Sequence, residues 1–149
     1  MVRAYVGLGS NLGDREGTIL AAAERLGPHR LSRIRETEPW GYADQPWFLN
    51  AAAELETELA PRELLERLLE IERGLGRTRN GPRYGPRTVD LDLLLYGDLV
   101  VAEPGLTVPH PRLAERLFVL EPLFELNAGL FIPGHGPVGA LIRGLQSKA

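Results

Sequence analysis

The chain has 149 residues, which is enough for one domain with a hydrophobic core. Its formal net charge of −3 argues against a general polyanion-binding surface. The sequence contains no run of about 18 apolar residues, which is the length needed to cross a membrane. The absence of cysteine excludes disulfides, thiolate metal sites and a cysteine nucleophile. We expect a single domain over residues 1–149, cytoplasmic, monomeric and without a signal peptide.

The first two thirds of the chain predict alternating strands and helices. Strands are expected over residues 2–9, 30–37, 47–57 and 88–96. Helices are expected over residues 14–26 and 61–75, with Asp14 as N-cap and Pro61 at a first helical position. This order predicts an α+β fold of ferredoxin-like βαββαβ type, an antiparallel sheet with helices packed on one face and C-terminal additions.

The expected C-terminal additions are shorter and less regular. They comprise an apolar piece at 99–101, a proline-bounded extended segment at 106–111, a helix over 112–126 interrupted by Pro122, and a short helix over 138–146.

Two acidic residues share one face of the predicted strand 88–96. Alternation places Asp90 and Asp92 on one face, with Val89, Leu91, Leu93 and Leu95 on the other. At a rise of ~3.3 Å per residue the two carboxylates start roughly 6.6 Å apart, a spacing that suits one hard cation or two. The alternative is a solvated strand face on which acids are harmless.

A cationic loop runs directly into this strand. Residues 76–87 carry Arg77, Arg79, Arg83 and Arg87 among glycines and prolines, with no acid. Guanidinium groups suit phosphate oxygens, and arginines beside Mg²⁺ with paired aspartates recur in phosphoryl transfer. Such a loop would close on its anion, unless it is only a solvated surface loop.

The third predicted strand adds an aromatic and an amide group to the same open face. Phe48 and Asn50 alternate with the apolar residues Leu49 and Ala51, so they face away from the helices. Phe48 is a candidate stacking surface for a flat ligand, and Asn50 adds a donor and an acceptor. The simpler interpretation places Phe48 and Phe118 in the core.

Other motifs are less specific. The spacing of Gly7, Gly9 and Gly13 does not match a dinucleotide fingerprint and no P-loop occurs, so these glycines predict close backbone approach and a tight turn. His110, between two prolines, has a structural role or contacts phosphate together with Arg116. Glu72, at the end of a predicted helix, is solvated or functional.

Four segments in order give the sequence a resemblance to a known family, 6-hydroxymethyl-7,8-dihydropterin pyrophosphokinase of folate biosynthesis. The most specific is Arg-Tyr-Gly-Pro-Arg-Thr-Val-Asp-Leu-Asp-Leu-Leu at 83–94. The others lie at 9–13, at 44–46 with 48–52, and at 106–111. The resemblance implies transfer of pyrophosphate from ATP to the hydroxymethyl oxygen of a reduced pterin, leaving AMP.

The resemblance also implies site residues. Asp90 and Asp92 would hold two Mg²⁺ ions, with Arg77 and Arg87 acting on the polyphosphate during catalysis. The positions expected around ATP are Glu72, Arg79, Arg83, Tyr84, Arg87, Leu93, Thr107, His110 and Arg116. The positions expected around the pterin are Thr37, Trp40, Phe48, Asn50, Asp90 and Phe118. Segments 11–15, 38–46 and 76–87 would be the moving lids.

Some positions depart from the family pattern, and two rival functions remain. The departures, which affect the pterin lid and the adenosine contacts, are Glu38, Trp40, Tyr84 and Pro111. One rival is a nucleotidyltransferase with Gly-Ser and Asp-x-Asp motifs, although Ser10 and Asp90 are far apart in the chain. The other is an RNA-binding module, which the acidic net charge argues against.

Overall fold

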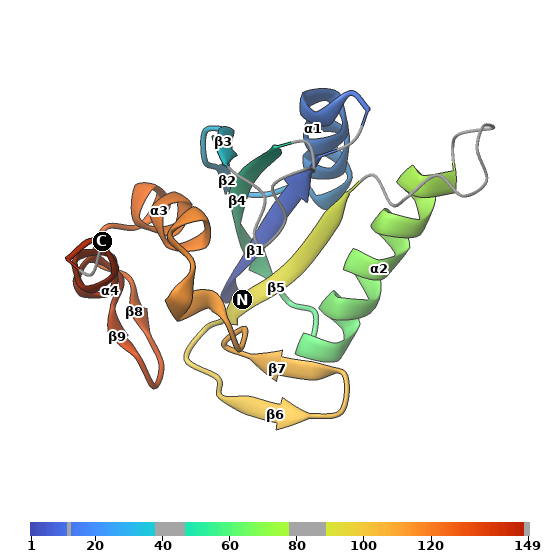
Figure 1. Ribbon diagram of the computed structural model, residues 1–149. Coiled ribbons are helices and arrows are strands. Elements are labelled where there is room, and N and C mark those ends of the chain that lie inside the picture. Colours follow the sequence, from blue (N-terminus) through green and yellow to red (C-terminus); the bar gives the residue numbers. More distant parts are fainter. Residues whose placement is uncertain (12, 38–46, 78–88, 148–149) are drawn as a thin grey trace.

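The protein is an α+β structure built on one antiparallel sheet. The computed structural model describes residues 1–11, 13–37, 47–77 and 89–147, without the side chains of residues 76 and 77. The sheet strands are β1 (Val2–Ser10), β2 (Arg30–Leu31), β3 (Arg35–Thr37), β4 (Phe48–Thr57) and β5 (Asp90–Tyr96). Their order is β2-β4-β1-β5, and β3 also pairs with β4, so β1 and β4 form the centre of the sheet (Figure 1).

Two helices cover one face of this sheet, as predicted. Helix α1 (Arg15–Leu26) begins where the Asp14 carboxylate accepts the Gly17 backbone N–H at 3.0 Å, and it ends at Gly27, whose φ of 65° is left-handed. Helix α2 (Pro61–Arg77) opens with proline. The apolar stripes of both helices pack on alternate residues of β1, β4 and β5 to form the larger core cluster.

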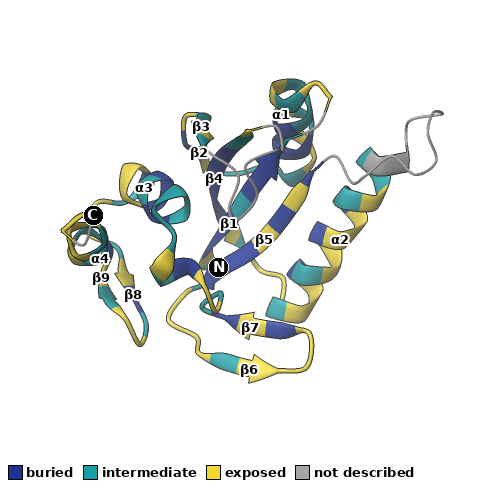
Figure 2. Ribbon diagram, viewed as in Figure 1, coloured by how far each residue is buried: buried dark blue, intermediate teal, exposed yellow. Residues whose placement is uncertain are grey.

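The other face of the sheet, which was expected to be open, is partly covered by the C-terminal additions, whose position was not predicted. Helix α3 (Leu117–Leu126) packs on this face and α4 (Val138–Gln146) packs on α3 (Figure 1). Tyr5, Ala52 and Leu94 of the sheet share a second buried cluster with Leu120 and Leu123. Figure 2 shows the result, with β1, β4 and β5 largely buried between the two helical layers.

A β-bulge between β1 and β5 corrects one detail of the predicted strand alternation. Tyr5 pairs with Leu95 and Val6 with Leu93, so Leu94 is an extra residue. Leu91 and Leu93 face α1 and α2 as expected, but Leu95 joins the second cluster on the opposite face. The extra residue changes the alternation beyond it, so both faces of this end of the sheet are apolar.

Two other predicted elements are interrupted. The strand expected over 30–37 divides into β2 and β3, because Ser32 uses both its N–H and its hydroxyl oxygen on the backbone of Ala52. The helix expected from residue 112 is a 3-10 turn at Leu113–Glu115 followed by α3. The break falls at Arg116, whose backbone is extended, and Pro122 lies inside α3 without ending it.

The remaining elements are two short hairpins. They are formed by β6 (Val101–Glu103) with β7 (Leu106–Val108), and by β8 (Phe131–Ile132) with β9 (Gly136–Pro137). The first contains parts of the apolar piece and the extended segment that were predicted, and the second was not predicted. Among the described residues, no helix combines the length and apolarity needed to span a bilayer.

Candidate active site

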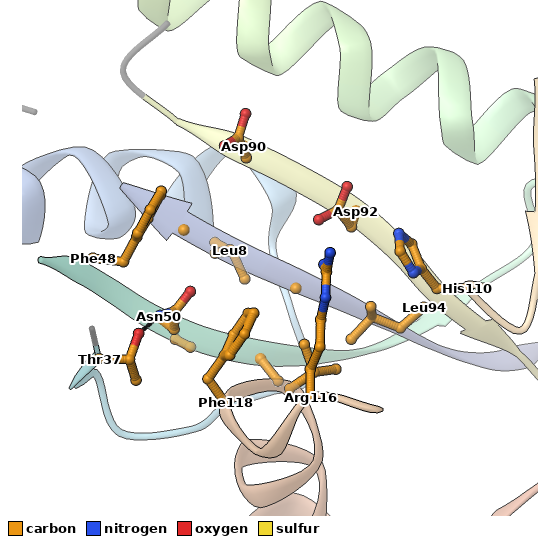
Figure 3. A pocket seen from close by; sticks show the side chains of 15 residues that line it. Leu8, Thr37, Phe48, Asn50, Asp90, Asp92, Leu94, His110, Arg116 and Phe118 are labelled. Carbon is orange, nitrogen blue, oxygen red and sulfur yellow. Dashed lines mark hydrogen bonds between the residues drawn. The ribbon is translucent and has the colours of Figure 1, made fainter. Parts of the chain in front are cut away.

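A cavity of about 350 Å³ opens on the sheet face that α1 and α2 leave free (Figure 3). The strands β1, β4 and β5 form its floor, and the start of α3 forms one wall. Eight of the residues predicted for the site line it: Thr37, Phe48, Asn50, Asp90, Asp92, His110, Arg116 and Phe118. Tertiary structure therefore brings together side chains from five separate parts of the chain.

The two aspartates lie on the edge strand β5 with glycines beside them. Asp90 pairs with Gly9 of β1 and Asp92 with Gly7, so the strand next to the carboxylates carries no side chain at these positions. Both aspartates are exposed while Leu91 between them is buried. The carboxylates thus stand beside an open strip of backbone.

An aromatic and amide group forms the opposite side of the cavity. Phe48 of β4 and Phe118 of α3 both enter it, from different elements (Figure 3). Between them, Asn50 Nδ2 donates to Thr37 Oγ1 at 2.5 Å. A Cβ added at Gly9 would lie only 3.1 Å from Asn50 Oδ1, so glycine there leaves room for the amide. This side of the cavity suits a flat heterocycle with hydrogen-bonding edges.

His110 and Arg116 complete the charged side of the cavity. The Arg116 guanidinium carbon lies 5.6 Å from the centroid of the Phe118 ring, and the side chain extends toward Asp92 and His110 (Figure 3). Burial lowers the pKa of His110, against the opposing effect of Asp92. His110 Nδ1 accepts the Arg112 backbone N–H at 3.2 Å, which places the proton of the neutral ring on Nε2.

The aspartate pair fits a magnesium site by its donor chemistry. Carboxylate oxygens are hard ligands, and Mg²⁺ commonly takes one or two carboxylates together with substrate phosphates and water. In the described part of the chain, no group of three or more histidine, aspartate or glutamate side chains is arranged to hold a metal. Phosphates and water would therefore supply most of the coordination sphere.

Three predicted residues lie outside the cavity lining. Leu93 is buried against the α1 and α2 side of the sheet, and Thr107 is exposed on β7. Glu72 reaches β5 from α2, where its Oε2 accepts the Leu91 backbone N–H at 2.7 Å. Outside the described residues lie Trp40, Arg79, Arg83, Tyr84 and Arg87, together with the side chain of Arg77.

Some lining residues were not predicted for the site. Gly7 and Gly9 were expected to allow close backbone approach, but their place beside the aspartates follows only from strand pairing. Their spacing of two within a strand was the available signal. Leu94 lines the cavity because it shares the strand face of Asp90 and Asp92, and Val119 does so because α3 crosses this face. The alternation of strand 88–96 was a signal for Leu94, whereas Val119 had none.

The cavity combines two aromatic rings with carboxylates and cationic groups, which suits an enzyme that acts on a small molecule with a flat ring. Residues 5–128 match the family described as 7,8-dihydro-6-hydroxymethylpterin-pyrophosphokinase (HPPK). The chain therefore belongs to the HPPK family.

Individual relatives agree with this assignment. The 2-amino-4-hydroxy-6-hydroxymethyldihydropteridine pyrophosphokinase of Bacillus subtilis is 51% identical over 129 residues, covering 83% of this chain and 77% of that protein. The protein of the same name from Pseudomonas aeruginosa is 47% identical over 137 residues, covering 88% and 84%.

A solved structure resembles the fold despite low sequence identity. The crystal structure of Plasmodium falciparum HPPK-DHPS wild type matches with a TM-score of 0.74 at 13% identity, covering 99% of this chain and 41% of that one. At this identity the likeness concerns the fold alone.

Proposed function

We propose that the protein transfers pyrophosphate from ATP to the hydroxymethyl group of 6-hydroxymethyl-7,8-dihydropterin. The products are the pterin diphosphate and AMP, and the reaction belongs to folate biosynthesis. One observation carries this proposal in addition to family membership: the aspartate pair and the two phenylalanines line the same cavity. A ring held by Phe48 and Phe118 would present its hydroxymethyl arm to a phosphate chain held near Asp90 and Asp92.

The pterin lies between the two phenylalanine rings in this proposal. Offset stacking on aromatic faces favours a flat heterocycle, and the Asn50 amide with the Thr37 hydroxyl hydrogen-bonds its edge. Gly9 keeps the floor low enough for the ring to enter. Two further pterin contacts are proposed. One is Trp40, which lies outside the described residues, and the other is Asp90, which lines the cavity.

Asp90 and Asp92 would hold Mg²⁺, with two ions expected. Ions bound there would supply positive charge to the ATP phosphates and to the oxygen atoms that gain charge during transfer. The protein's own contribution is to keep both carboxylates on one strand face, beside glycine backbone and at the edge of the aromatic group. Such fixed placement reduces the reorganisation that the reaction requires.

Cationic groups would bind the polyphosphate. His110 and Arg116 line the cavity, and Arg77, Arg79, Arg83 and Arg87 are proposed to close over ATP. Arg77 and Arg87 are proposed to act during the chemical step, and the neutral His110 can donate from Nε2. The further proposed ATP contacts are Glu72, Tyr84, Leu93 and Thr107.

The reaction itself needs no covalent enzyme intermediate. The substrate hydroxyl oxygen attacks the β-phosphorus of ATP in line and loses its proton as the new oxygen–phosphorus bond forms. The bond from the β-phosphorus to the oxygen that bridges to the α-phosphate breaks, and AMP leaves. Positioning and electrostatic stabilisation are sufficient for this type of transfer.

The decisive experiment is incubation of the protein with ATP, Mg²⁺ and 6-hydroxymethyl-7,8-dihydropterin. We expect one AMP for each pterin diphosphate, and no product when the pterin is omitted. Released pyrophosphate with a nucleotidylated product would favour nucleotidyl transfer instead. Salt-sensitive RNA binding without turnover would favour the RNA-binding alternative.

We also infer that the sheet is ferredoxin-like and that residues 1–149 act as one pyrophosphokinase domain. The antiparallel order β2-β4-β1-β5, with one helix after β1 and one after β4, supports the first inference. Monomeric state, cytoplasmic location and movement of the three lids stay predictions.

A further inference from the structure

A second cavity, of about 340 Å³, lies between the β2–β3 region, α3 and α4. It shares no lining residue with the candidate active site. Its lining residues are Arg33, Arg35, Glu121, Phe124, Glu125, Gly139, Ile142 and Arg143. Cavities of this size, with an apolar wall and a few convergent polar groups, are typical of small-molecule sites.

The charges around this cavity favour an anion. Glu125 is engaged by two arginines: its Oε1 lies 3.1 Å from Arg35 Nη2 and 3.8 Å from Arg33 Nε. Its Oε2 also accepts the Arg33 backbone N–H at 2.9 Å. Arg143 forms no ion pair with a residue in the described ranges, nor does Glu121. The three arginines exceed the two glutamates by one positive charge.

One guanidinium nitrogen among the lining residues lacks a hydrogen-bond acceptor. Arg35 Nη1 is buried and has no hydrogen-bond partner within the described structure, although Nη2 of the same side chain is paired. A buried charged donor without an acceptor is costly, and an anion bound against the Arg35 guanidinium would offset part of that cost. An anionic oxygen that reached both Arg35 and Arg143 would receive charge-assisted hydrogen bonds.

The other wall of the cavity is apolar and is kept open by a glycine. The Phe124 side chain is 43% exposed, and Ile142 lines the cavity beside it. A Cβ added at Gly139 would lie 3.5 Å from both Phe124 Cε1 and Arg143 Nη1. A larger side chain at this position would therefore occupy the space between the ring and the guanidinium. Glycine is otherwise unfavourable inside a helix.

We infer that this cavity is a second ligand site for a small organic anion that carries an aromatic body. The anionic group contacts Arg35 and Arg143, and the ring packs on Phe124 and Ile142. The proposal is independent of the pyrophosphokinase activity, because it uses none of the residues assigned to that reaction.

The test uses naphthalene-1-sulfonate as the probe, titrated into the ¹⁵N-labelled full chain. We expect saturable shifts at the backbone amides of residues 33, 35, 139 and 143. The Gly139→Leu variant fills the space and should weaken binding about tenfold or more, since both the ring and the anion lose contacts. Gly144→Leu is the matched control on the same helix, because a Cβ at Gly144 meets nothing within 4 Å.

A second variant and two further compounds separate charge from packing. Arg143→Gln keeps the helix and should also weaken naphthalene-1-sulfonate about tenfold. Naphthalene-1-methanol, which lacks the charge, and inorganic sulfate, which lacks the ring, should each bind much more weakly than the probe. Should Gly139→Leu fail to fold, Arg143→Gln still decides the outcome.

Three outcomes would overturn the inference. One is unchanged probe affinity in the folded variants Gly139→Leu and Arg143→Gln. Another is a set of shifts confined to the candidate active site, around Asp92 and Phe118. The third is sulfate binding as tight as that of the probe, which would leave no role for the apolar wall.

Discussion

The carboxylate of Glu72 accepts the backbone N–H of Leu91 at 2.7 Å, between the two aspartates of the candidate active site. Helix α2 thereby holds β5 at the point where Asp90 and Asp92 enter the cavity. Because Leu91 is buried, its N–H depends on this acceptor. We therefore assign Glu72 a positioning role for the aspartate pair.

Glu72→Ala should lower both kcat and stability, because it leaves the Leu91 N–H without its acceptor. We expect a loss of about 1–3 kcal/mol in the free energy of unfolding, measured in urea, and a drop in kcat of about tenfold. Glu72→Gln keeps an acceptor oxygen and should restore most of both quantities. Equal impairment in the two variants would contradict the positioning role.

Asp92→Ala should reduce turnover by about 100-fold or more while the fold is retained, because a charged group near the transferring phosphates is lost. Asp92 is exposed, so the free energy of unfolding should change by no more than about 0.5 kcal/mol. AMP formation and urea unfolding measure the two effects. Asp98→Ala, in the exposed turn after β5, is the matched control. Near-normal Mg²⁺-dependent rates in Asp92→Ala would remove the metal assignment.

Phe48→Ala should weaken pterin binding and leave ATP binding largely unchanged. Losing one stacking partner costs about 0.5–1.5 kcal/mol beyond the buried area, so the Kd for the pterin should rise at least two- to tenfold. Isothermal titration with each substrate separately checks this selectivity. Phe131→Ala removes a phenylalanine that is 60% exposed and outside the cavity, and should affect neither substrate. Equal losses for pterin and ATP would refute the stacking role.

Tyr5→Phe should change how stability depends on alkaline pH. Burial raises the pKa of Tyr5, whose hydroxyl donates to Glu54 Oε2 at 2.8 Å. The unfolded chain loses this proton near pH 10 while the folded protein keeps it, so the free energy of unfolding falls as the pH rises above 10. Thermal unfolding between about pH 9 and 11 measures this slope.

The two proteins are compared by how steeply their free energy of unfolding falls with pH, not by its absolute value. Tyr5→Phe loses the hydrogen bond to Glu54 and the longer one from Asn127, and should be less stable by about 1–2 kcal/mol at neutral pH. Its stability should nevertheless fall less steeply above pH 10 than that of the unchanged chain. The same slope in both proteins would show that Tyr5 is not the group responsible.

Local sequence patterns predicted much of the framework because their causes are local. Asp14 caps α1 and Pro61 opens α2, since both effects act within one helical turn. Asp90 and Asp92 share a strand face because alternation is a property of any extended chain. The resemblance to known sequences added the family and its reaction, which residue patterns alone left open among several classes.

Tertiary structure decided the features that depend on a partner distant in the chain. Leu94 became the bulged residue only through pairing of β5 with β1, and Ser32 divides a strand through its bonds to Ala52. Arg116 and Phe118 reach the cavity because α3 packs on the sheet face that carries Asp90 and Asp92. By itself, then, the sequence determined the long strands, the two covering helices and the faces of their side chains as far as the bulge. Which faces meet was decided only in the folded chain, because apolar surfaces from distant segments must be buried together.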